Sequence, residues 1–163
     1  MATPDPSHIS KAQQLVASRV VKGHSNASIS AKLQRSESTV RSHIQKGSKI
    51  VGCASGSSRA MYAHALLTRK QVAPPSTPRT GIHFTAREER LLHALVTHSR
   101  IDDIARAAGI HRDDVRLETD ALRCKTRALN NAHLVGIAHS LKIFERAAHE
   151  APEGAPHASV PGL

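Results

Sequence analysis

Hydrophobic residues recur at helical spacing along most of the chain, and short polar or glycine-rich runs interrupt them. Val16 and Val20 lie four residues apart, as do Leu91 and Leu95, so each pair occupies one face of a predicted helix. A shift of 75 residues aligns the two pairs and superimposes "ISKAQQLVASRVV" on "FTAREERLLHALV". The pattern therefore predicts two tandem units of similar organisation.

Each unit is predicted to contain four short helices. The first helix opens with a capping box, Ser10-x-x-Gln13 in one unit and Thr85-x-x-Glu88 in the other. A second and a third helix follow, separated by the three-residue turn "QRS" (34–36) or "GIH" (109–111). The fourth helix is predicted over 58–69 in the first unit and over 131–147 in the second.

The buried positions of these helices follow from the same spacing. The second helix directs Ile29 and Leu33 inward in the first unit, and Ile104 and Ala108 in the second. In the third helix of the first unit, Val40 and Ile44 lie four residues apart and mark the inner face. Two helices joined by a short turn inside a small helical bundle form a helix-turn-helix.

The predicted fold is all-α, with two small four-helix, helix-turn-helix bundles in tandem. A joint with three prolines, "QVAPPSTPRTGI", separates them and is expected to be an exposed, semi-rigid linker. We expect both ends of the chain to be disordered, the C-terminal one because it is rich in Pro, Gly and Ala. The predicted boundaries are 1–7 for the N-terminus, 8–70 for the first domain, 71–82 for the linker, 83–146 for the second domain and 147–163 for the tail.

The net charge of +10 is distributed unevenly between the two halves. Residues 1–80 hold 12 Lys or Arg and two acids, whereas residues 81–163 hold 11 of each kind. All of the excess positive charge therefore lies in the first half. This asymmetry indicates that only the first domain meets a polyanion.

Several runs of residues resemble the LuxR/FixJ-type helix-turn-helix family. The first domain carries "KGHSNASISAKL" and "SESTVRSHI", which resemble the family's G-x-S-N-x-x-I-A-x-x-L and S-x-x-T-V-K-x-H. The second carries "FTAREERLL", "IARAAGI" and "NNAHLVGIA", which resemble the family's opening segment and parts of its later helices. The resemblance implies two divergent copies of one bacterial DNA-binding domain. Each copy keeps motifs that the other has lost.

The resemblance implies that the third helix of the first domain lies in the major groove of duplex DNA. Positions matching Arg41, Ser42 and Gln45 face the bases in relatives, and Arg41 would pair with guanine and Gln45 with adenine. The resemblance assigns phosphate contacts to Ser25, Asn26, Thr39, His43, Lys46 and Lys49. The alternative is that these side chains form an ordinary solvated basic helix face.

The matching helix of the second domain is a poor candidate for DNA contact. Its outer surface carries Asp113, Asp114, Glu118 and Asp120, and acids repel phosphates. The alternative is that Arg112, Arg116 and Arg123 pair with these acids along the helix. Either way, folding support, self-association or binding of a basic protein partner is the expected role of this domain.

An apolar stripe on the last predicted helix indicates how the second domain would associate. Leu134, Ile137, Leu141 and Phe144 recur at spacings of three and four residues, and relatives pair through their last helix. The stripe makes these four residues candidates for homodimerisation. Packing within the domain explains the same spacing equally well.

Other kinds of site lack a sequence signature. The sequence contains no phosphate loop or nucleophile motif, so we expect neither an enzyme nor a cofactor. Cys53 and Cys124 belong to no C-x-x-C pair, and the 12 histidines are scattered, so no metal site is expected. The first ten residues lack the features of a signal peptide, which favours a cytoplasmic, nucleoid-associated location.

Sequence-specific DNA binding in transcriptional control is therefore the predicted function, with double-stranded DNA as the partner of the first domain. Two alternatives stay open. In the first alternative, the chain is a protein-interaction module, such as an anti-activator or an adaptor of the transcription machinery. In the second, it is a non-specific, nucleoid-type DNA binder.

Overall fold

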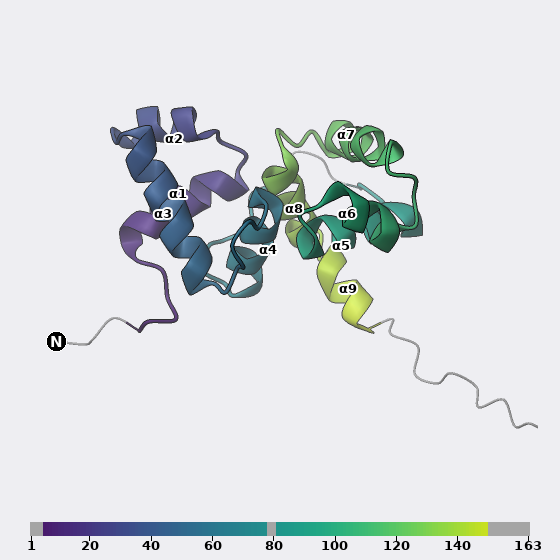
Figure 1. Ribbon diagram of the computed structural model, residues 1–163, viewed down its shortest axis with the longest axis horizontal. Helices are drawn as coiled ribbons and strands as arrows, with labels where there is room; N and C mark the ends of the chain where they lie inside the picture. Colours follow the sequence, from purple (N-terminus) through teal and green to yellow (C-terminus); the bar gives the residue numbers. More distant parts are fainter. Residues whose placement is uncertain (1–4, 78–80, 150–163) are drawn as a thin grey trace, which may run out of the picture.

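The computed structural model describes residues 5–77 and 81–149, and all regular structure in these two ranges is helical. The predicted all-α class is therefore confirmed for this part of the chain (Figure 1). Its helices are α1 (Lys11–Val21), α2 (Asn26–Leu33), α3 (Glu37–Ile50), α4 (Arg59–Thr68), α5 (Ala86–Thr97), α6 (Ile101–Ala108), α7 (Asp114–Thr126), α8 (Asn131–Ser140) and α9 (Ile143–His149).

The segments expected to be disordered fall mostly outside the described residues. This holds for residues 1–4 of the N-terminus and for residues 150–163 of the tail. Residues 147–149, which we assigned to the tail, belong to the last turn of α9.

Both predicted capping boxes are present. The Gln13 backbone N–H donates to Ser10 Oγ at 3.2 Å, and the Ser10 N–H donates to Gln13 Oε1 at 2.8 Å. Thr85 and Glu88 exchange the same two bonds at the start of α5. Each box satisfies two backbone donors that a helix start would otherwise leave free, so the sequence fixes where α1 and α5 begin.

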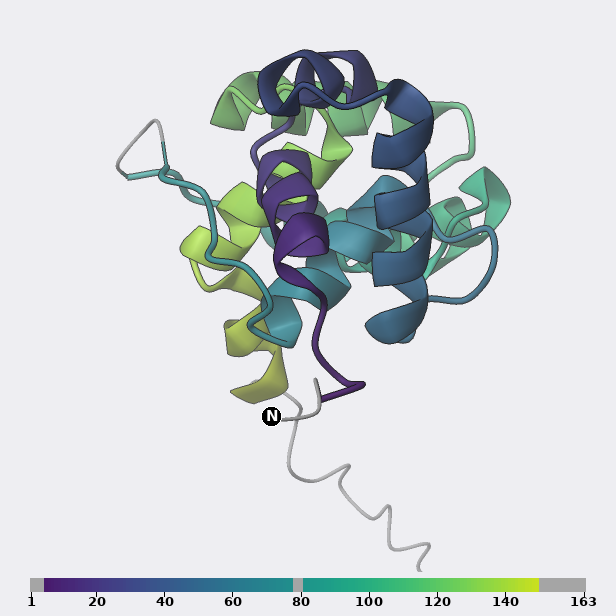
Figure 2. The ribbon, with the colours of Figure 1, turned by 90° about the vertical axis from the view of Figure 1, so that its left-hand side faces the viewer.

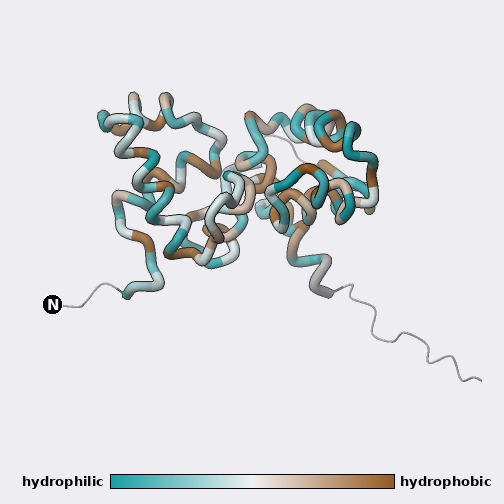
Figure 3. Tube along the Cα trace, in the orientation of Figure 1, coloured by the Kyte–Doolittle hydropathy of each residue, from teal (hydrophilic) through white to brown (hydrophobic). Residues whose placement is uncertain are grey.

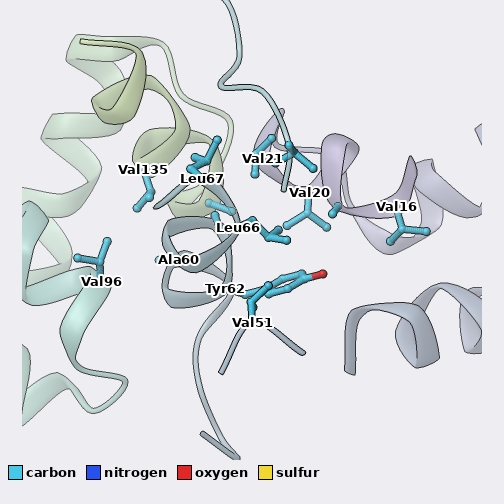
Figure 4. Close-up of a cluster of buried hydrophobic side chains, with 14 of the residues drawn as sticks. Val16, Val20, Val21, Val51, Ala60, Tyr62, Leu66, Leu67, Val96 and Val135 are labelled. Atoms are coloured by element: carbon cyan, nitrogen blue, oxygen red, sulfur yellow. The ribbon is translucent and has the colours of Figure 1, made fainter. Parts of the chain in front are cut away.

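The helices form two halves that meet along α4 and α8 (Figure 1). Hydrophobic and hydrophilic stretches alternate along the helices, as amphipathic packing requires (Figure 3). One buried cluster centres on α1 and α4, against which α2 and α3 each place one buried side chain, and a second cluster centres on α5, α6 and α8. The first cluster also includes Val96 and Val135 from the second half, and Val135 lies near Leu67 of α4 (Figure 4). Burial of apolar surface therefore joins the two halves.

Close approach at Gly136 shows how tightly α8 fits against the first half. A Cβ atom at this position would lie 2.8 Å from the Val21 carbonyl oxygen and 2.8 Å from Pro75 Cγ. Both distances are shorter than van der Waals contact, and one of the atoms belongs to the backbone. Only glycine allows the end of α1, the joint and α8 to meet here.

The joint between the halves is packed against the helices along part of its length. Gln71, Val72 and Pro75 are buried. The Ile9 N–H donates to Gln71 Oε1 at 3.0 Å, and the hydroxyl of Ser140 donates to the Pro75 carbonyl. The expectation of an exposed linker is wrong for these residues, because both halves supply partners for the joint. Residues 78–80 lie outside the described part of the chain.

The predicted fourth helix of the second half divides into two. α8 ends at Ser140, Lys142 adopts a left-handed backbone conformation with φ of 58°, and α9 begins at Ile143. The change of direction places the Phe144 ring 4.8 Å from the rings of both His64 and His139, measured between centroids. The prediction of a single helix over 131–147 is therefore wrong, since tertiary packing of Phe144 overrides the local helical pattern.

No helix in the described ranges is both long and apolar enough to cross a membrane.

Candidate nucleic-acid interface

Three polar residues determine the local geometry of the helix-turn-helix formed by α2 and α3. Ser25 caps α2 by accepting from the Ser28 N–H, and Ser36 caps α3 by accepting from the Thr39 N–H. Between them, Gln34 adopts a left-handed conformation with φ of 52° and ends α2. The chain therefore turns over 34–36, as predicted, and begins α3 at Glu37.

The inner faces of the two helices are those that the hydrophobic spacing predicts. Ile29 and Val40 are completely buried. Leu33 and Ile44 are half-buried and pack against the same cluster. Burial of Val40 and Ile44 on one side fixes the rotation of α3 about its axis and leaves the opposite face of the helix toward solvent.

The outer face of α3 carries long polar side chains. Arg41, Gln45, Lys46 and Lys49 are exposed, and the Arg41 side chain retains 64% of its accessible surface. Arg41 Nη2 lies 3.9 Å from Glu37 Oε2, an exposed pairing that contributes little free energy and yields readily to a stronger partner. Three further candidates on α3 are half-buried: Thr39, Ser42 and His43.

The electrostatic character of this region is strongly positive. Residues 26–50 contain five Lys or Arg and a single acid, Glu37. Figure 2 looks onto this side of the molecule, where α3, in blue, runs alongside α1, in purple. A basic helix with exposed arginine, glutamine and lysine side chains has the donors that DNA recognition needs.

Three of the predicted phosphate-binding residues also have structural partners. The Ser25 hydroxyl caps α2, and Asn26 Oδ1 accepts from Arg59 Nη1 at 2.6 Å. Thr39 Oγ1 lies 2.8 Å from Ser36 Oγ at the start of α3. These contacts hold the three side chains at the starts of α2 and α3, where helices have backbone N–H groups without intrahelical partners.

No sequence motif indicates a role for Arg59, which positions the start of α2. Besides Asn26, it donates through Nη2 to the His24 carbonyl at 2.9 Å. Asn130 of the second half donates to the Gly23 carbonyl at 3.0 Å. Gly23 has φ of +86°, and a Cβ there would lie 2.9 Å from His133 Cβ. Residues 23–26 are thus held by contacts from α4 and from the start of α8.

The corresponding surface of the second half carries nearly equal numbers of acidic and basic residues. Residues 101–126 contain six acids and five Lys or Arg. Asp113 and Asp114 are exposed at the start of α7, beside the exposed side chains of Arg116 and Leu117. α7 begins at Asp114, and no side-chain cap is present at its start. The turn before α7 is therefore longer than the predicted 109–111.

Ion pairs neutralise the other acids of α7, in part as the alternative interpretation predicts. Asp120 pairs with Arg123 along the helix, whereas Glu118 pairs with Arg87 of α5. Arg112 pairs with Asp102 of α6 at 3.2 Å instead of with an acid of α7. The net effect is an outer face on which carboxylates balance the cations.

The four dimerisation candidates pack against other residues of the same chain. Leu134 and Ile137 are completely buried, and Leu141 and Phe144 are half-buried. Leu134 belongs to the core cluster of its own half, and Phe144 packs against both clusters. Packing within one chain, the alternative to self-association, therefore accounts for this apolar stripe in the structure.

The described residues contain no group of three or more His, Cys, Asp or Glu that could hold a metal ion. Cys53 and Cys124 are free thiols. Two histidines are nevertheless in contact, since His64 Nδ1 lies 2.9 Å from His139 Nε2 where α4 meets α8.

Comparison with known proteins finds one similarity, and it lies in the first half. Residues 7–62 match the model for bacterial regulatory proteins of the luxR family, over α1, α2, α3 and the start of α4. Residues 7–62 are therefore similar to the helix-turn-helix domain of a family of DNA-binding transcription regulators, as the resemblance implied. The match covers one copy, so a second copy over 83–146 stays a prediction. No significant match to a curated protein or to a solved structure was found.

Proposed function

We propose that this protein is a sequence-specific transcription regulator in which α3 occupies the major groove of duplex DNA. The observation that carries the proposal is the outer face of α3, where Arg41 and Gln45 are exposed within the matched domain. Arg41 and Gln45 carry the bidentate donors and acceptors that distinguish guanine and adenine. Ser42 lies between them and contacts the same groove.

Phosphates on either side are held by a second set of groups. Lys46 and Lys49 are exposed on the next turn of α3, and His43 and Thr39 flank the base-contacting residues. The N-terminus of α2, with Ser25 and Asn26, adds backbone donors that are rigidly held through Arg59. These contacts fix orientation and carry most of the salt dependence of binding.

The second half serves this domain as a structural partner. Its α8 packs against α4, and the resemblance implies that relatives associate through the same last helix. We infer that residues 83–146 are a divergent second copy, and that the pairing of last helices takes place within one chain. The balanced charge on α6 and α7 supports a role in association or partner binding rather than in DNA contact.

A mobility-shift titration with selected and random duplexes distinguishes this function from its alternatives. The proposal predicts binding of a selected duplex at least about 1,000-fold tighter than binding of random DNA at physiological salt. Equal affinity for both duplexes would identify a non-specific, nucleoid-type binder. Absence of binding to either would favour a protein-interaction module, such as an anti-activator.

A further inference from the structure

An open cavity of about 630 Å³ lies where the two halves meet, away from the outer face of α3. The starts of α4 and α8 form one side of it, and the end of α5, the start of α6 and the inner side of α7 form the other. Its volume falls within the range of pockets that take small organic molecules, about 300–1,000 Å³. Neither the match to a DNA-binding domain nor the proposed DNA contacts use this space.

Cationic groups outnumber acids around this cavity. Arg59, Arg116 and Arg123 line it together with a single acid, Asp120. Asp120 pairs with Nη2 of Arg123, while Nε of the same guanidinium is buried without a hydrogen-bond partner. Arg116 is exposed, and the described residues show no ion pair for it. The lining thus carries a net positive charge and an unused buried donor.

Arg59 strengthens this positive character because its hydrogen-bond acceptors in the described part of the chain are both neutral. Its two hydrogen bonds reach Asn26 Oδ1 and the His24 carbonyl oxygen, and burial lowers the pKa of its guanidinium. Two helix starts on the same side, capped by Ser58 and Asn130, add partial positive charge. An anionic group would offset the cost of burying Arg59.

The remaining walls define what the anion is attached to. Leu95, Ile104 and Val115 supply apolar surface. Asn131 Oδ1, also on the wall, is a buried acceptor without a partner. An uncompensated buried acceptor costs free energy, and a ligand N–H or O–H would remove that cost.

From these features we propose that the cavity binds a small organic anion. The ligand carries a carboxylate, phosphate or sulfonate group for the three arginines. It also has an apolar body for the walls and an N–H or O–H that donates to Asn131. The chain would accordingly carry its own effector site.

The site is connected to the DNA-binding domain through Arg59, and this step rests on the proposed function. Arg59 is the residue that joins the cavity to the start of α2, through Asn26 and His24. An anion that draws the guanidinium toward the cavity weakens these two bonds and loosens the start of α2. Ligand binding therefore lowers DNA affinity, and by linkage DNA lowers ligand affinity by the same factor.

The binding step is tested with the full chain and the fluorescent probe 8-anilinonaphthalene-1-sulfonate. This probe combines a sulfonate, aromatic rings and an N–H donor, and its uncharged counterpart, N-phenyl-1-naphthylamine, lacks only the sulfonate. We expect one sulfonate probe per chain, bound at least about tenfold more tightly than the uncharged probe. Similar affinity for both probes would overturn the proposal, because the arginines would then contribute nothing.

Matched arginine variants locate the probe. Arg116→Gln and Arg123→Gln are each expected to weaken sulfonate binding by at least about fivefold. Arg106→Gln, an exposed arginine of α6 outside the cavity, serves as the control and leaves binding unchanged. Thermal unfolding followed by circular dichroism verifies that the variants remain folded. Equal loss in all three variants, or in none, would contradict a site in this cavity.

The effect on DNA is measured separately, so that the two proposals fail in different ways. A saturating sulfonate probe is expected to weaken DNA binding of the wild type but not of Arg123→Gln. An unchanged wild-type affinity would overturn the coupling through Arg59. Failure of the chain to bind any DNA would overturn the proposed function, whereas the probe titrations would still decide whether the cavity binds anions.

Discussion

Replacing Arg41 by alanine is expected to weaken binding of a selected duplex by about 1–3 kcal/mol, or roughly 5- to 150-fold. The preference for one base pair should be lost at the same time. The physical reason is that Arg41 is exposed on α3, where its guanidinium has a weak 3.9 Å contact with Glu37 and no other ion pair within residues 5–77 and 81–149. The measurement is a titration of DNA variants that differ at single base pairs.

Lys46→Ala is the informative comparison for Arg41→Ala, because Lys46 is assigned to a phosphate. Its loss should weaken binding to all sequences alike and reduce the salt slope by about one unit. Lys11→Ala, which removes an exposed lysine at the start of α1, controls for the general loss of positive charge. If Arg41→Ala also weakened all duplexes equally, Arg41 would not contact a base.

Acidification is expected to destabilise the contact between the two halves, with His139 as the main cause. Burial lowers the pKa of His139 to about 4, and it also lowers the pKa of His64. Their hydrogen bond of 2.9 Å needs a lone pair on one ring, so the pair accepts at most one additional proton without breaking. The Phe144 ring packs against both rings, His93 lies on its other side, and Lys70 and Glu145 line the adjoining cavity.

The sign of this effect follows from the direction of the shift. A histidine whose pKa is depressed by folding binds more protons in the unfolded chain, so stability is complete above about pH 6.5 and falls toward pH 4. Allowing for solvent screening of a half-buried ring, the loss is about 2 kcal/mol. The pKa of Glu88 is lowered because its Lys125 partner and the helix start outweigh burial, and the pKa of Glu118 is lowered by its Arg87 partner. Both carboxylates keep their full stabilising effect above about pH 4.5 and lose it only as the pH falls further, so they do not cause the loss between pH 6.5 and 4.5.

Denaturant unfolding at a series of pH values between 4.5 and 7 measures this loss. The free energy of unfolding of the wild type should decrease steadily as the pH falls from 7 to 4.5. The free energy of unfolding of His139→Gln should depend less steeply on pH. His111→Gln, an exposed histidine of the second half, is the matched control and should follow the wild type. A wild-type stability that is constant over the interval would show that the pair is not held neutral.

Local features of the fold were predictable because they depend on nearby residues. The capping boxes at Ser10 and Thr85 and the turn after α2 depend on side chains within three or four positions. Ile29 and Val40 were assigned to the core from spacing alone, and both are completely buried. The same spacing correctly assigned Arg41 and Gln45 to the exposed face of α3.

Features that depend on contacts between distant residues were not predictable. Arg59 reaches Asn26 across 33 positions, and Ser140 reaches Pro75 across 65, so no local pattern announces either contact. The stripe through Leu134 and Ile137 fits a dimer interface and an internal one equally well, because periodicity gives a face but not its partner. Only the packing of α8 on α4 distinguishes them in this structure.

The central claim is that α3, and not α7, lies in the groove of bound DNA. Its most direct test attaches an iron chelate that cleaves DNA to a single cysteine, at Gln45→Cys of α3 or at Leu117→Cys, an exposed position on α7. Cys53 and Cys124 are replaced by serine in both proteins. We predict strand cleavage within the selected site from position 45 and none above background from position 117. Equal cleavage from position 117, or cleavage from that position alone, would contradict the claim.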